Sequence, residues 1–207
     1  MHIYAFGSVC RGEVDDDSDI DMLAVIDEND RNVSEMNFSI YSQDKLKAIW
    51  REGNPFAWHL RLESAMVFSS DGTDIIESLG EPSKYSRARA DCLSFIDLFD
   101  SAATSIRMGT NSIHFELSTI FIAARNFAIC YSFEKEGRPV FSRQAPLLLG
   151  EHSLRLPSTS YSTLERSRIL ASRGIGEQVE RQQLNSTIED LPKIRQWMTK
   201  LMEGLTL

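Results

Sequence analysis

The chain has 207 residues and a net charge of −8, with 42% apolar and 25% charged residues. This composition is ordinary for a globular protein of one large or two small domains. The negative charge disfavours nucleic acid as a partner, because a phosphate backbone is repelled by it. No apolar run approaches the roughly 20 residues that span a bilayer, so we expect no membrane partner. Three widely spaced cysteines and an N-terminus without leader features predict a reducing, cytoplasmic location.

The first 80 residues mix short strands and helices. The predicted strands span residues 2–6, 20–26, 35–41 and 65–68, from their apolar or alternating character. Ser42 is predicted to cap a helix that reaches about Trp50, and Pro55 to begin the next one.

Helical spacing dominates from about residue 84 onward. Composition changes near residues 80–83, which predicts a linker. Apolar residues recur at helical spacing in 93–106, 113–131 and 191–205, whereas the glycines and prolines of 137–160 predict loops. The predicted fold class is therefore α+β, with a small mixed sheet and flanking helices in residues 1–80 and an all-α bundle in residues 84–207.

A glycine bend follows the first predicted strand. Gly7 allows the backbone to turn and to approach a ligand closely. The residues after it begin a helical turn, whose free N–H groups favour an anion. Ser8 adds a hydroxyl donor and Arg11 a planar guanidinium, both suited to phosphate. The segment therefore predicts a phosphate-binding bend.

Two aspartates lie at the start of the second predicted strand. Asp19 and Asp21 are two residues apart, so their carboxylates point to the same face of a strand. Neighbouring carboxylates repel each other unless a cation or a proton lies between them. Mg²⁺ is commonly held by one or two carboxylates together with substrate phosphates. The two motifs together predict a site for a metal and a nucleotide.

These motifs resemble the signature of a known superfamily. They are Gly7-Ser8, Arg11-Gly12 and Ser18-Asp19-x-Asp21. They are similar to those of the DNA polymerase beta-like nucleotidyltransferases, in particular the minimal and kanamycin-type domains, over residues 1 to about 80. The resemblance implies that the glycine bend and Ser18 help to bind a nucleoside triphosphate, with ATP as the leading candidate. It also implies that Asp19 and Asp21 bind two Mg²⁺ ions.

The third acidic position of this superfamily is ambiguous here. The resemblance aligns Asn37 with it, while Glu35 lies on the same face of the predicted strand and could replace it. Asn can bind a metal through its oxygen, but it cannot act as a base near neutral pH. We therefore name both residues, with Asp19 and Asp21, as catalytic candidates.

The helical half resembles the HEPN-type bundles that accompany such nucleotidyltransferases, and it is expected to help bind the acceptor. Ribonuclease members carry a histidine after the arginine that Arg125 would match, and this chain has none there. The sequence thus predicts an enzyme that transfers a nucleoside monophosphate to a hydroxyl of a small molecule or protein and releases pyrophosphate. The alternative is a catalytically weakened, nucleotide-binding regulatory or toxin–antitoxin module. A homodimer is left open.

Overall fold

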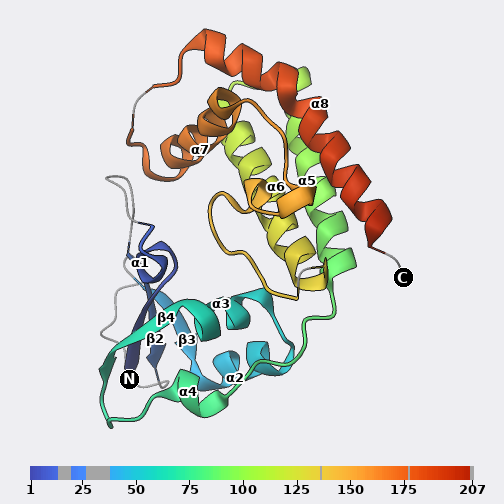
Figure 1. Ribbon diagram of the computed structural model, residues 1–207. Coiled ribbons are helices and arrows are strands. Elements are labelled where there is room, and N and C mark those ends of the chain that lie inside the picture. The colour runs from blue at the N-terminus through green and yellow to red at the C-terminus, as the bar shows by residue number, and fades with distance from the viewer. Residues whose placement is uncertain (14–19, 27–37, 136, 177, 206–207) are drawn as a thin grey trace. The chain divides into compact units, whose positions relative to one another are not determined.

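The computed structural model describes residues 1–13, 20–26, 38–135, 137–176 and 178–205 (Figure 1). Contacts between residues divide the chain into two compact units, Met1–Ser86 and Arg87–Leu207. Each unit is described below by itself. The domain bounds 1–80 and 84–207 stay a prediction about parts that fold independently.

The first unit is built on a mixed sheet of four strands. They are β1 (His2–Phe6), β2 (Asp21–Ile26), β3 (Ser39–Ser42) and β4 (Ser64–Ser69). Their order is β3-β2-β1-β4, with β1 antiparallel to β2 and to β4, and β2 parallel to β3. The first, second and fourth predicted strands are confirmed. Of the third predicted strand, residues 35–37 lie outside the described residues, and β3 covers its end.

The helices of the first unit begin where side chains can cap them. They are α1 (Ser8–Arg11), α2 (Gln43–Arg51), α3 (Pro55–Glu63) and α4 (Ile75–Leu79). The Ser42 hydroxyl accepts a hydrogen bond from the Lys45 N–H at 3.2 Å, which confirms the predicted cap of α2. The predicted start of α3 at Pro55 is also confirmed, and the side chain of Asn54 caps it.

One face of the sheet carries the core of this unit, against α2 and α3. Its buried apolar residues are Tyr4, Phe6, Leu23, Val25, Leu46, Trp50, Ala57, Leu60 and Ile76. Tyr4 pairs with Leu23, and Phe6 with Asp21, across β1 and β2. Because side chains alternate along a strand, Asp21 lies on the same face as Leu23 and Val25. The core register therefore determines where the Asp21 carboxylate stands.

The second unit is helical, which confirms the predicted α+β class. Its helices are α5 (Ala88–Arg107), α6 (Ile113–Lys135), α7 (Ser158–Arg173) and α8 (Arg181–Gly204). Helix α6 packs against α5, α7 and α8. Between α6 and α7 lie two short 3-10 turns, η1 (Ala145–Leu147) and η2 (Gly150–His152).

Two features of this unit differ from the prediction. Helix α7 was not expected, and α8 begins at Arg181 rather than near Leu191. The buried face of α7 includes three hydroxyl residues, Ser160, Thr163 and Ser167, so its apolar periodicity is weak. The Ser160 hydroxyl donates to the Asp190 carboxylate of α8 at 2.6 Å, so these two buried polar groups between the helices are hydrogen-bonded to each other.

Helix α6 is long and apolar enough to cross a membrane by length and composition. This corrects the expectation that no such stretch exists. However, 56% of its most apolar window is buried inside the protein, as in the central helix of a bundle. The absence of a membrane partner stays a prediction.

The core of the first unit provides a direct test of the fold. Leu60 of α3 is fully buried, whereas Leu62 of the same helix is 51% exposed. We expect Leu60→Ala to lower the free energy of unfolding by about 2 to 5 kcal/mol, because it leaves a cavity. Leu62→Ala is the matched control and should cost less than about 1 kcal/mol. Urea unfolding measures both, and equal losses would contradict the packing of α3 on the sheet.

Candidate functional site

The backbone of Gly7 touches the carboxylate of Asp21. Gly7 ends β1 with a φ of 80°, a conformation that residues with a side chain rarely adopt. A Cβ atom on Gly7 would lie 2.7 Å from Asp21 Oδ2, closer than real Cβ contacts. The pairing of Phe6 with Asp21 places the bend and the start of β2 side by side. The predicted glycine bend and one of the two predicted aspartates therefore meet in space.

Helix α1 continues this bend as a single turn. It begins at Ser8, ends at Arg11, and is closed by Gly12, whose φ is 71°. The N–H of Cys10 donates to the Gly7 carbonyl at 3.1 Å, while the N–H of Gly7 donates to the Glu63 carbonyl at 3.2 Å. Ser8 is partly exposed, so its hydroxyl is accessible to a ligand at the bend. One turn carries a much smaller dipole than a long helix, so its free N–H groups contribute more than its dipole.

Arg11 is held by two carboxylates. Its NH1 lies 2.5 Å from Glu63 Oε2, and its Nε lies 3.0 Å from Glu13 Oε2. Burial lowers the pKa of Arg11, but the hydrogen bonds and charges of Glu63 and Glu13 raise it above its usual value. A phosphate that binds Arg11 must therefore share or replace these carboxylates. Phosphate binding by Arg11 stays a prediction.

Glu63 connects Arg11 to a histidine and was not predicted as a site residue. His59 Nε2 lies 3.0 Å from Glu63 Oε2, and the His59 ring packs edge-on against Phe6 and Phe56. Burial raises the pKa of Glu63, but hydrogen bonds from His59 and Arg11 and their charges outweigh burial and lower it. The i,i+4 spacing of His59 and Glu63 on a predicted helix was the one sequence signal for this pair. No local sequence pattern indicates that Arg11, 52 residues before Glu63, completes the cluster.

Four predicted site residues lie outside the described residues: Ser18, Asp19, Glu35 and Asn37. The structure therefore leaves the distance between the two aspartates, and the choice between Glu35 and Asn37, as predictions. Within the described ranges, no three His, Cys, Asp or Glu side chains gather in a way that could hold a metal ion.

The comparison with known families agrees with this geometry. Residues 2–79 match the model of the nucleotidyltransferase domain. The match covers β1 through α4 and supports both the superfamily indicated by the motifs and nucleotidyl transfer as the general activity of this unit. It does not extend to the helical unit, whose resemblance to HEPN bundles stays a prediction. No curated protein matches the chain.

Of the predicted metal ligands, Asp21 is the one within the described residues, and its carboxylate suits a divalent metal ion of the kind used by nucleotidyltransferase domains. Asp21 is exposed, and a hard oxygen ligand is what Mg²⁺ prefers. The missing side chain at Gly7 lets the Asp21 carboxylate lie against the backbone of the bend. Asp21 would supply one ligand to the ion, with Asp19 as the predicted second.

Substitution of Gly7 tests the contact with Asp21. Gly7→Ala must both adopt a strained φ and displace the Asp21 carboxylate, so we expect a loss of about 2 kcal/mol or more in the free energy of unfolding. Gly80→Ala is the matched control, since its φ of 66° and ψ of −149° resemble the 80° and −140° of Gly7 but no atom lies within 4 Å of the added Cβ. It should lose only about 1 to 2 kcal/mol. Equal losses in thermal or urea unfolding would show that Asp21 does not rest against Gly7.

The cluster around Glu63 predicts a pH dependence of stability. The pKa of Glu63 is lowered in the folded protein from 4.5, so its ionised form stabilises the fold fully above about pH 4.5. This contribution is lost as the pH falls through the lower, folded-state pKa. The difference in unfolding free energy between the wild type and Glu63→Gln should therefore be present at neutral pH and shrink below about pH 4.5. Glu52→Gln, an exposed residue of the same unit, is the control, and a difference that grows at low pH would refute the assignment.

Proposed function

We propose that the first unit transfers a nucleoside monophosphate from a nucleoside triphosphate, with ATP as the first candidate, to a hydroxyl acceptor. In this reaction the acceptor oxygen bonds to the α-phosphorus. The bond from that phosphorus to the oxygen bridging the α- and β-phosphates breaks, and pyrophosphate leaves. The hydroxyl proton passes to a base. Bound Mg²⁺ would supply neutralisation of the charge on the phosphates and the leaving group.

Each residue of the bend has a role in this proposal. Gly7 binds the β- and γ-phosphates through its backbone, and Ser8 binds them through its hydroxyl. Asp21 and Asp19 hold the metal ions, with Ser18 beside them. Glu35 or Asn37 fills the third position. Only Glu35 can accept the acceptor's proton near neutral pH, because an amide is not a base in that range.

The observation that carries the proposal is the contact between the Gly7 bend and the Asp21 carboxylate. A polyanion and a carboxylate repel each other, so a triphosphate can bind at this bend only with a cation between them. The match to the nucleotidyltransferase domain over residues 2–79 supports the same chemistry independently. In the Arg11–Glu63–His59 cluster beside the bend, Arg11 is a second cation besides the metal ion. A phosphate can bind Arg11 by replacing the Glu63 carboxylate.

For the acceptor we propose a chemical class rather than one molecule. A small molecule or a protein hydroxyl is compatible with the net charge of −8, whereas an RNA acceptor is disfavoured by it. The helical unit is proposed to help bind this acceptor. A cytoplasmic location completes the proposal and can be examined by fractionation. A homodimer is left open, and sedimentation of the purified chain decides it.

Asp21→Asn tests the reaction. The substitution keeps the size of the side chain but removes the negative charge that attracts the metal ion. We expect a loss of at least about a hundredfold in the transfer of label from an α-³²P triphosphate in the presence of Mg²⁺. The assay uses the purified full chain with each of the four triphosphates and a cell extract as the source of acceptor.

Asp44→Asn is the matched control, because Asp44 is an exposed aspartate of the same unit at the start of α2. It should keep its transfer activity. Full activity of Asp21→Asn would remove the proposal. If the wild type binds Mg²⁺ and triphosphate in calorimetry but labels no product, the regulatory-module alternative replaces the enzyme.

A further inference from the structure

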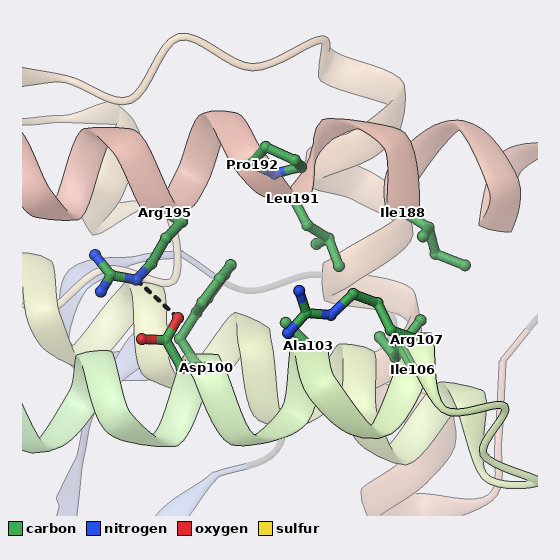
Figure 2. Close-up of a pocket in the computed structure, with 9 residues that line it drawn as sticks. Asp100, Ala103, Ile106, Arg107, Ile188, Leu191, Pro192 and Arg195 are labelled. Atoms are coloured by element: carbon green, nitrogen blue, oxygen red, sulfur yellow. Dashed lines mark hydrogen bonds and ion pairs between the residues drawn. The ribbon is translucent and has the colours of Figure 1, made fainter.

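A pocket lies between α5 and α8, wholly within the helical unit (Figure 2). Its volume is about 270 Å³. Its apolar walls are formed by Phe99, Ala103 and Ile106 of α5 and by Ile188, Leu191 and Pro192 of α8. Phe99 and Leu191 are almost fully buried, so they form its floor. This volume suits a small organic molecule better than a protein segment.

Three charged side chains line the same pocket, and they differ in whether they are paired with an opposite charge. Arg195 Nε donates to Asp100 Oδ1 at 2.7 Å, as Figure 2 shows, and its NH1 donates to Thr199. Arg107 donates to the Thr104 hydroxyl at 2.9 Å, and no carboxylate of the described residues pairs with it. Two guanidiniums against one carboxylate leave the pocket with a surplus of one positive charge.

Figure 2 shows the Arg107 side chain running along the pocket between the two helices, rather than outward from α5. Arg107 is exposed, and its guanidinium lies beside the apolar walls, where a ligand anion can reach it. Its planar N–H groups match a carboxylate in a two-point contact. The pocket therefore combines a hydrophobic cavity with one cation of specific geometry.

On the side of α8, a proline interrupts the backbone hydrogen bonding of the helix. Pro192 lies inside α8 and has no N–H, so it cannot donate to the Ile188 carbonyl one turn earlier. Both residues line the pocket.

We propose that this pocket binds a small amphipathic carboxylate, with its apolar part on Phe99 and Leu191 and its carboxylate on Arg107. The surplus positive charge argues for an anion, and the apolar walls argue for an alkyl or aryl body. The pocket belongs to the helical unit, and the proposal does not rest on the nucleotidyl transfer proposed for the first unit.

Calorimetric titration of the full chain with octanoate tests this assignment. We expect saturable binding to the wild type and about tenfold or more weaker binding to Arg107→Gln, because a charge-assisted contact is lost. Arg155→Gln is the control, since Arg155 is an exposed arginine of the same unit outside the pocket. It should bind octanoate as the wild type does. 1-Octanol, which has the same chain without the charge, should bind the wild type and Arg107→Gln equally.

A second variant tests the cavity rather than the charge. Ala103→Phe fills the space between the helices, and it should abolish the binding of both octanoate and 1-octanol, with circular dichroism checking that α5–α8 still fold. Absence of octanoate binding to the wild type, or equal affinity of Arg107→Gln, would overturn the proposal. So would a wild-type dimer in sedimentation that Ala103→Phe dissociates, since the pocket would then be covered by a second copy of the chain.

Discussion

The site depends on one close approach, that of the Gly7 backbone to the Asp21 carboxylate. This approach is a product of strand pairing. Phe6 faces Asp21, and two residues along, Tyr4 faces Leu23 in the buried core, so the register cannot slip without exposing that core. A one-residue slip would also turn Asp21 to the opposite face of the sheet. Hydrophobic burial thus fixes the position of a charged group, and the absence of a side chain at Gly7 lets that group come near.

The two carboxylates near the bend, Glu63 and Asp21, differ in whether they are paired with positive groups. Glu63 is bound by Arg11 and His59, and its pKa is lowered accordingly. Asp21 is exposed and borders the bend. The paired carboxylate stabilises the junction of α3 and β4, where the Glu63 carbonyl also receives the Gly7 N–H. The exposed carboxylate is the one that remains able to bind a cation, as the proposed function requires of Asp21, while the cluster stabilises the scaffold.

Sequence patterns predicted the parts of the structure whose signals are local. The strand before Gly7, the Ser42 cap and the Pro55 start each depend on residues within one turn or one strand. Helix α7 was not predicted because the face it buries includes Ser160, Thr163 and Ser167. The Ser160 hydroxyl bonds Asp190 and the Ser167 hydroxyl lies 3.3 Å from His114 Nδ1, partners that only the fold supplies. Glu63 was not predicted as a site residue for a related reason, since its partner Arg11 lies far away in the chain. The positions of Asp19, Glu35 and Asn37 stay predictions.

The net charge of −8 bears differently on the ligands proposed for the two units. A field from distant surface charges is screened over about 8 Å at physiological ionic strength, so it acts on polyanions that extend along the surface. A small anion inside a pocket interacts mainly with the groups that line it. At the Gly7 bend the nearest described charge is negative, and a triphosphate needs a metal ion. Between α5 and α8 the surplus charge is a guanidinium, so a carboxylate can bind there without a metal ion.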